Sequence, residues 1–216
     1  MSVKGVFFDL DGTLIDSRGD LAAAVNHVRK NNGLAELPLE TVASHAGNGL
    51  TKLIERCFPE MAVTPEIESG VRDYYSANEV VNTVLYPGVR EGLAQLSAAG
   101  LTLAVVTNKA TGNTVNILQK LGVAEFFTEI FGAGGAFALK PSPEGIEHLL
   151  KKYDFSSGDC WMLGDHYTDM AAARQAGVWR ALAGWGFGSL NGEGFDRSFV
   201  NFADFTEFIL SNRATS

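Results

Sequence analysis

The stretch VFFDLDGTLIDS, residues 6–17, decides the fold, because an apolar run carries the chain to Asp9 and Asp11, two aspartates beside a glycine. The run GVFFDL, which begins at Gly5, has the continuous apolar character of a strand that is buried on both faces. Turns collect aspartate and glycine for their own backbone preferences, so one D-x-D pair is a weak sign of a site. Its interpretation depends on the residues at the ends of the later strands.

Four similar apolar runs recur: LTLAVVTN from Leu101, FTEIFGAG from Phe127, DCWMLGD from Asp159 and VWRALAGW from Val178. Helical patterns lie between them, beginning at Val89, Thr111, Glu144 and Thr168. Strands that alternate with helices of about ten residues predict an α/β fold, with a Rossmann-like parallel sheet and helices on both faces. Ligands of such sheets bind at the carboxyl ends of the strands.

Residues 17–83 interrupt this alternation after the first strand. They show almost no strand signal, and their helical patterns cover Asp20–Asn31, Leu39–Phe58 and Pro65–Asn78. We therefore predict two domains: an α/β core domain of residues 1–16 and 84–216, and an inserted all-helical domain of residues 17–83.

Acidic residues gather after two of the predicted strands. Asp165 and Asp169 in GDHYTD stand four apart across the start of a helical pattern, so both can face one side. A helix N-terminus also favours acidic residues through its dipole, which is the competing interpretation of this pair alone. Together with Asp9 and Asp11 they make four carboxylates, which repel one another unless cations are present. Hard oxygen ligands in that number indicate Mg²⁺.

Polar residues of another kind follow two other strands. Thr107 and Asn108 precede a helical pattern that opens at Thr111, where a hydroxyl, an amide and free backbone N–H groups would meet an anion. Lys140, beyond the third strand, is the natural cation for the acidic cluster and for a substrate anion. Taken singly, the threonine and asparagine also fit ordinary helix caps, and the lysine fits an exposed loop residue.

Length, charge and cysteine usage exclude several classes of protein. A chain of 216 residues can bury about 70% of its unfolded surface in one core with a smaller appendage. The formal net charge of −8, without a block of lysine or arginine, argues against a nucleic-acid partner. Cys57 and Cys160 indicate neither a disulfide framework nor a zinc site, which fits a reducing compartment. Without a signal sequence or a run of ~20 apolar residues, we expect a cytoplasmic monomer or homodimer with no membrane partner.

In order along the chain, DLDGT, VVTN, LKP and GDHYTD resemble the four motifs of the haloacid dehalogenase (HAD) superfamily, over essentially the whole chain. The helical insert resembles the C1 cap of the phosphoglycolate phosphatase-like branch. The loop AGNGL, residues 46–50, is similar to a cap loop of that branch, and YPGV at Tyr86 is typical of the return from cap to core. The resemblance implies a HAD core with an inserted C1 cap.

The resemblance also implies phosphoryl transfer. Asp9 would attack phosphorus to give an aspartyl-phosphate, and Asp11 would protonate the leaving oxygen and then activate water. Dehalogenating members lack an aspartate at the position of Asp11. The ligands of Mg²⁺ would be the Asp9 carboxylate, the Asp11 backbone carbonyl and Asp165. Asp169 would lie next to these ligands without binding the metal directly.

The same resemblance assigns the phosphoryl group to four residues, Gly12, Thr107, Asn108 and Lys140, and implies that Lys140 offsets charge among the aspartates. Two departures from the family pattern bear on the substrate. His166 stands where many relatives have serine; it is either a group that supports the site residues from behind or a partly exposed loop residue, and we favour the latter. The run GGAFALKP lacks the acidic residues that often precede the lysine in phosphoglycolate phosphatases.

We expect the cap to select the substrate, with Arg18, His45 and Asn48 as its polar residues near the site, although each equally fits a solvated surface group. The leading hypothesis is a Mg²⁺-dependent phosphatase that hydrolyses a small phosphorylated metabolite of the phosphoglycolate or sugar-phosphate type. The alternatives are a phosphosugar mutase of the β-phosphoglucomutase type and a non-catalytic binding protein that keeps the fold. Phosphonate hydrolysis would need a Schiff-base lysine in the cap, where only Lys52 lies near the cap loop.

Overall fold

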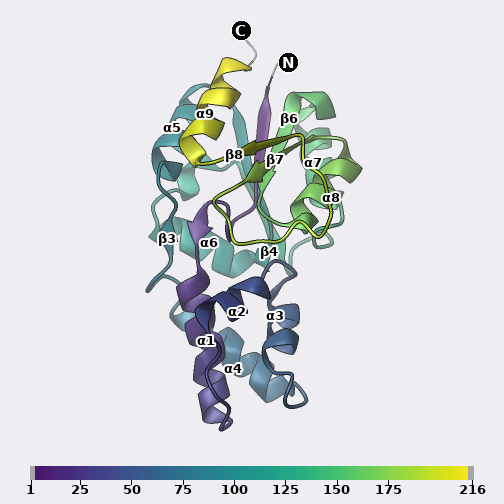
Figure 1. Ribbon diagram of the computed structural model, residues 1–216. Helices are drawn as coiled ribbons and strands as arrows, with labels where there is room; N and C mark the ends of the chain where they lie inside the picture. The colour runs from purple at the N-terminus through teal and green to yellow at the C-terminus, as the bar shows by residue number, and fades with distance from the viewer. Residues whose placement is uncertain (1–2, 214–216) are drawn as a thin grey trace.

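A six-stranded parallel sheet is the main feature of the computed structural model, which describes residues 3–213 (Figure 1). Across the sheet the strands follow the order β5-β4-β1-β6-β7-β8. Their bounds are β1 Gly5–Phe8, β4 Thr102–Ala110, β5 Glu129–Ala133, β6 Cys160–Gly164, β7 Trp179–Ala183 and β8 Arg197–Phe199. The five predicted strands and the α/β fold class are confirmed. The sequence pattern did not predict β8, which has three residues and no apolar run.

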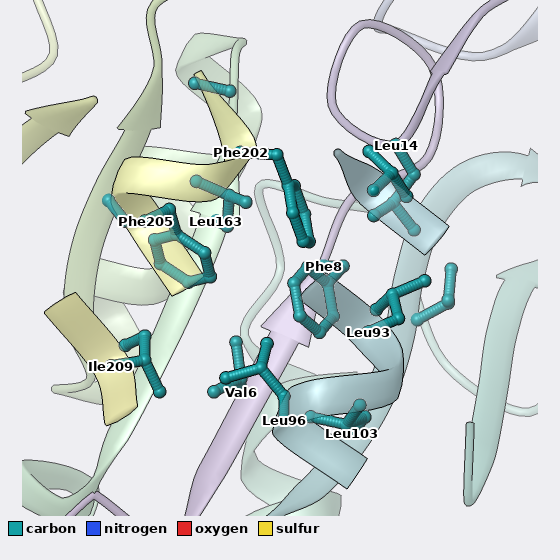
Figure 2. Packing of buried hydrophobic residues seen from close by; sticks show 14 of the residues in the cluster. Val6, Phe8, Leu14, Leu93, Leu96, Leu103, Leu163, Phe202, Phe205 and Ile209 are labelled. Carbon is teal, nitrogen blue, oxygen red and sulfur yellow. The ribbon is translucent and has the colours of Figure 1, made fainter. Parts of the chain in front are cut away.

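Helices cover both faces of the sheet, which explains the unbroken apolar run of β1. Val6 and Phe8 face one helical layer, in which the ring of Phe8 lies 6.0 Å from that of Phe202 (Figure 2). Phe7 faces the other layer, and all three side chains are fully buried. The helices that accompany the sheet are α5 Val89–Ala98, α6 Thr111–Lys120, α7 Glu144–Tyr153, α8 Tyr167–Ala176 and α9 Phe202–Ser211, with short 3₁₀ turns η1 Ala124–Phe126 and η2 Ser157–Asp159.

The inserted segment forms four helices below the carboxyl end of the sheet in Figure 1. They are α1 Arg18–Asn31, α2 Leu39–Ser44, α3 Leu50–Cys57 and α4 Pro65–Ala77, and they share a separate apolar core. The single helical stretch expected over Leu39–Phe58 is wrong, because Gly47 and Gly49 take positive φ angles of 100° and 87° and break it into two helices. No helix within residues 3–213 is long and apolar enough to cross a bilayer.

Two connections join these helices to the α/β part, and one carboxylate ties them together. The connections pair as a short antiparallel ladder, β2 Ile15–Asp16 with β3 Val84–Leu85. Asp20, 3% exposed, accepts hydrogen bonds from the backbone N–H groups of Val81, Asn82 and Thr83 at 2.9–3.0 Å. The entry and the exit of the helical segment are thus held together.

Candidate active site

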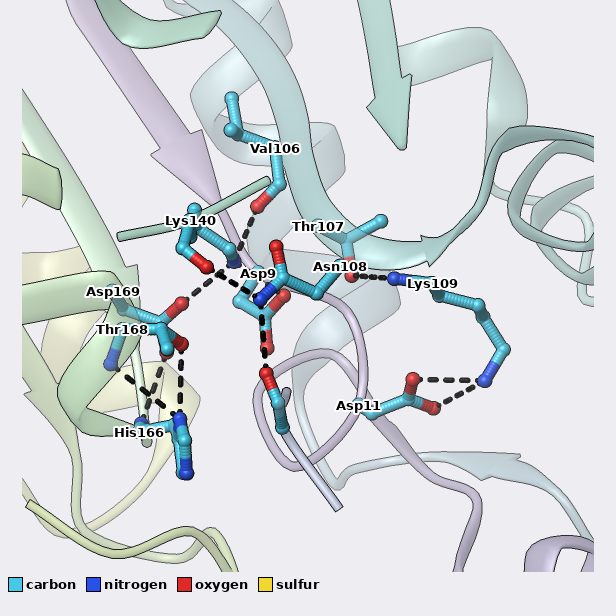
Figure 3. Close-up of polar contacts among 11 residues, drawn as sticks. Asp9, Asp11, Val106, Thr107, Asn108, Lys109, Lys140, His166, Thr168 and Asp169 are labelled. Carbon is cyan, nitrogen blue, oxygen red and sulfur yellow. Dashed lines mark hydrogen bonds and ion pairs between the residues drawn. The ribbon is translucent and has the colours of Figure 1, made fainter. Parts of the chain in front are cut away.

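The site is built around Asp9, which follows β1 at the carboxyl edge of the sheet. The ammonium of Lys140, from the loop between β5 and α7, lies 2.7 Å from Asp9 Oδ1 and 2.6 Å from Asp169 Oδ1 (Figure 3). It also donates a hydrogen bond to the carbonyl of Val106 at 2.6 Å. The Lys140 side chain is 2% exposed, so it is not the exposed loop residue that the sequence also allowed. It is the cation that links two buried carboxylates.

Asp9, Asp165 and Asp169 form a buried acidic cluster in which oxygens from all three lie within 4.8 Å of one another. Burial raises the pKa of Asp9 to about 6, and the Asp169 charge adds to this although Lys140 opposes it. Burial and the charges of Asp169 and Asp9 raise the pKa of Asp165 well above its usual value. Lys140 alone therefore leaves the cluster short of positive charge, which a divalent cation would supply.

Gly12 leaves the space into which Asp165 reaches. Its φ is +81°, and a Cβ at this position would lie 1.9 Å from Asp165 Oδ2. That oxygen accepts hydrogen bonds from the backbone N–H groups of Phe187 and Gly188 at 3.0 and 2.8 Å. The carboxylate oxygens of the cluster are donors that fit Mg²⁺, which Asp9 and Asp165 could hold, and the Asp11 carbonyl as a further ligand remains a prediction.

Asp11 points away from this cluster, toward Lys109, a lysine that the motifs alone did not single out (Figure 3). The ammonium of Lys109 lies 2.8 Å from both Asp11 carboxylate oxygens, and the Ser17 hydroxyl donates a hydrogen bond to Asp11 Oδ1. The Lys109 side chain is 7% exposed. The available signal was its place in VVTNK, directly after the polar pair Thr107 and Asn108 at a strand end.

Thr107 and Asn108 lie at the site, both buried near the end of β4. The Asn108 amide nitrogen donates hydrogen bonds to the carbonyls of Gly47 and Lys140 at 3.0 and 2.9 Å (Figure 3). Asn108 thereby connects the loop after α2 with the loop that carries Lys140. The Thr107 hydroxyl accepts a hydrogen bond from the Lys109 backbone N–H at 3.3 Å.

His166 is 6% exposed, so its interpretation as a partly exposed loop residue is wrong. It caps α8: its Nδ1 lies 2.9 Å from the Thr168 hydroxyl, and its backbone N–H donates to Asp169 Oδ2 at 2.9 Å. Gly47 covers the ring so closely that a Cβ there would approach it to 2.7 Å. Burial lowers the pKa of His166 to about 4.

The three polar residues expected in the cap occupy different positions. Asn48 donates a hydrogen bond to the Tyr167 hydroxyl at 2.7 Å and so joins the loop between α2 and α3 to α8. Arg18 pairs with Asp16 at 2.8 Å, and the carbonyl of His45 accepts a hydrogen bond from Arg56, both outside the cavity lining. Their effect on substrate choice remains a prediction.

A cavity of about 70 Å³ lies between the two parts of the chain, with Asp9 and Asp11 in its wall. The α/β part contributes its polar lining, which includes Thr107, Asn108 and Lys109. The helical part contributes mainly apolar residues: Leu21, Ala46, Leu50 and Leu53. This volume admits on the order of five water-sized groups, so the cavity fits a small ligand with a polar end and an apolar flank.

Comparisons with known proteins agree with this arrangement. Residues 6–183 match the family model described as haloacid dehalogenase-like hydrolase. A phosphoglycolate phosphatase of Nitrosospira multiformis is 36% identical over 184 residues, which cover 82% of this chain and 81% of that protein. A second phosphoglycolate phosphatase, from Chromobacterium violaceum, is 35% identical over 209 residues and 94% of each chain.

The fold is shared with a solved structure over almost its full length. The crystal structure of a predicted phosphoglycolate phosphatase from Haemophilus somnus has a TM-score of 0.90 and 31% identity, and the match covers 96% of this chain and 98% of that one. The family model, the two relatives and the ordered strand-end residues lead to one assignment. The chain belongs to the haloacid dehalogenase-like hydrolase family.

Proposed function

We propose that the protein is a Mg²⁺-dependent phosphatase that hydrolyses a small phosphate monoester through an aspartyl-phosphate on Asp9. The observation that carries this proposal is the pairing of Asp9 with Lys140 at 2.7 Å, in the wall of a small cavity that also contains Asp11. Phosphoglycolate is the first candidate substrate, because the relatives from N. multiformis and C. violaceum are both named for it.

The proposed reaction has two steps, formation and hydrolysis of the aspartyl-phosphate. An Asp9 carboxylate oxygen forms a bond to phosphorus while the ester P–O bond breaks, and Asp11 gives its proton to the leaving oxygen. Water then attacks the phosphorus of the aspartyl-phosphate while the bond between phosphorus and the Asp9 oxygen breaks; Asp11 accepts the proton of that water, and inorganic phosphate leaves with Asp9 restored. Lys140 keeps the Asp9 carboxylate oriented throughout, because it binds one oxygen of Asp9 and is itself held by Asp169.

The remaining site residues would bind the phosphoryl group and the cation. Gly12 and the backbone at Thr107 and Asn108 would face the phosphoryl oxygens at the strand ends. When bound, Mg²⁺ would neutralise charge on these oxygens and polarise the phosphorus. The helices within residues 17–83 would act as the cap, which excludes water from the cavity while the phosphoryl group is transferred.

The cavity and the nearby lysines help to weigh two alternatives, a phosphosugar mutase and phosphonate hydrolysis. The small cavity, about 70 Å³, favours a short leaving group over the hexose of a phosphosugar mutase. Phosphonate hydrolysis needs an uncharged amine, whereas the Asp11 carboxylate raises the pKa of Lys109 above its usual value against the opposing effect of burial. Lys52 is exposed and paired with Glu55 at 2.6 Å.

A substrate screen tests the proposal. Purified protein with Mg²⁺ is assayed for phosphate release from phosphoglycolate, glucose 1-phosphate, nucleotides and pyrophosphate. We expect the highest kcat/KM with phosphoglycolate, loss of activity on chelation, and a fall in kcat of at least about 10³-fold in Asp9→Asn. Activity of Asp9→Asn equal to the unsubstituted protein, or no phosphate from any ester, would contradict it. Isomerisation of β-glucose 1-phosphate with little free phosphate would indicate a mutase.

A further inference from the structure

Lys109 and Tyr75 meet across the cavity from opposite parts of the chain. Lys109 belongs to β4 of the α/β part, and Tyr75 belongs to α4 of the cap. The Lys109 ammonium lies 4.7 Å from the centre of the Tyr75 ring and 2.8 Å from each Asp11 carboxylate oxygen. Both side chains line the cavity. A cation is therefore held at the cap end of the site, beside the proposed proton donor.

The Tyr75 hydroxyl is a polar atom to which the proposed reaction gives no role. Tyr75 is 4% exposed, and within residues 3–213 its hydroxyl makes no hydrogen bond of normal geometry, although the Lys109 ammonium is a close neighbour. A buried hydroxyl without a partner is costly, so such a group in a cavity wall is expected to bind a ligand. The neighbouring Asn113 is already engaged, because its amide donates to Ser76 and Glu79 at 3.0 and 2.6 Å. Lys109 and Tyr75 are therefore the residues with donor groups in this part of the cavity lining.

The surroundings of this pair define what it can bind. Leu21, Leu50 and Leu53 form the apolar flank of the cavity, which suits the carbon atoms of a short leaving group. A buried ammonium and a phenol hydroxyl both donate hydrogen bonds, so their best common partner is a carboxylate.

The distance to Asp11 limits the length of that leaving group. If Asp11 protonates the leaving oxygen, the Lys109 ammonium lies within two hydrogen bonds of that oxygen, about 5–6 Å. With one or two carbon atoms between them and bonds of about 1.5 Å, a carboxylate oxygen lies about 3–5 Å from the ester oxygen, and one hydrogen bond of about 3 Å then reaches the ammonium.

We propose that Lys109 and Tyr75 are specificity residues that bind a carboxylate one or two carbons from the ester oxygen, which restricts the enzyme to short phosphorylated hydroxy acids. This inference rests on the proposed phosphatase function and adds the residues that select its substrate. The carboxylate would also join the core to the cap, since Lys109 and Tyr75 come from the two parts. A neutral phosphate ester lacks this connection.

The first test compares two esters in four variants and the unsubstituted protein. Phosphoglycolate and ethyl phosphate differ mainly in the carboxylate, so the ratio of their kcat/KM values reports its recognition. We expect Lys109→Met to lower this ratio by about 10–100-fold and Tyr75→Phe by about 3–10-fold. Lys109→Arg should recover part of the ratio because it keeps the charge. Lys52→Met, at an exposed cap lysine, should keep the ratio.

A binding experiment separates this role from an effect on Asp11. The probes are 3-phosphonopropionate, an inert analogue with the carboxylate, and propylphosphonate, which lacks it, each titrated calorimetrically with Mg²⁺ present. We expect the unsubstituted protein to bind 3-phosphonopropionate more tightly and Lys109→Met to lose that preference while still binding propylphosphonate, which also shows that the variant is folded.

Two results would overturn the inference. Equal losses of kcat/KM for both esters in Lys109→Met, with the preference for 3-phosphonopropionate unchanged, would mean that Lys109 only positions Asp11. Equal binding of the two phosphonates by the unsubstituted protein would mean that no carboxylate is recognised. Failure of the proposed function is distinguishable, because the protein would then hydrolyse neither ester while the phosphonate titrations still decide the role of Lys109.

Discussion

Gly12 has a positive φ of 81°, and its α-carbon faces the Asp165 carboxylate, so a side chain here meets two separate obstacles. The backbone conformation alone disfavours a Cβ by about 1 kcal/mol. The approach of 1.9 Å to Asp165 Oδ2 requires in addition that the carboxylate or the loop move. Because that carboxylate is proposed to hold Mg²⁺, this displacement should affect the reaction more than the stability of the fold.

We expect Gly12→Ala to lower kcat/KM by at least about 100-fold and to weaken Mg²⁺ binding, since small displacements of catalytic groups are costly. Steady-state kinetics and Mg²⁺ titration measure both effects. Gly100→Ala is the matched control: Gly100 has a φ of +79° and nothing within 4 Å of a Cβ. It should lose about 1 kcal/mol of unfolding free energy and keep its activity. Full activity in Gly12→Ala would refute the proposed crowding of Asp165.

At the scale of elements, the hydrogen bonds that join α1 to the segment before β3 depend on the charge of Asp20. Burial alone would raise the pKa of Asp20, but hydrogen bonds from Thr83 and Asn82 outweigh it and lower that pKa below the usual 3.8. A group with a lowered pKa in the folded state stabilises the fold at pH values above the usual pKa. That contribution is lost as the pH falls through the folded-state pKa.

Asp20→Asn should therefore lower the free energy of unfolding by about 1–3 kcal/mol at pH 7, and by progressively less toward about pH 3. Urea denaturation across this pH range measures the difference. Glu55→Gln removes a carboxylate from an exposed ion pair with Lys52 and should cost less than about 1 kcal/mol. If Asp20→Asn lowered the free energy of unfolding by the same amount at every pH, the charge of Asp20 would not be the source of the lost stability.

For the whole molecule, the acidic cluster predicts that Mg²⁺ stabilises the fold. At about 100 times Kd a bound ligand adds about 2.7 kcal/mol, which raises the Tm of a chain of this length by roughly 5–11 °C. Asp165→Asn should abolish this rise. Without Mg²⁺ its Tm should be no lower than that of the unsubstituted protein, because burial disfavours the charge of Asp165 and an amide oxygen can still accept from Phe187 and Gly188.

Differential scanning calorimetry with and without Mg²⁺ measures both outcomes. Asp73→Asn, an exposed position on α4, is the matched control and should respond to Mg²⁺ like the unsubstituted protein. An equal Tm rise in Asp165→Asn would place the stabilising cation elsewhere.

Local sequence patterns were sufficient to predict the sheet and the carboxylates at its edge. The apolar run before Asp9 predicted a strand buried on both faces, and Phe7 and Phe8 are indeed covered on opposite faces. Such patterns succeed here because they report which side chains are buried and where a strand must stop. A missing apolar run explains the failure at β8, which pairs with β7 through its backbone.

Lys140 was predicted from the sequence as the cation of the acidic cluster, but the pairing of Lys109 with Asp11 and the burial of His166 became visible only in the tertiary structure. Lys109 and Asp11 are 98 positions apart, and they meet because β1 and β4 are neighbours in the sheet. His166 is buried because Gly47, from the loop that breaks the predicted helix, lies on its ring. Such contacts depend on the packing of distant segments, whereas periodicity and turn preferences describe each segment alone.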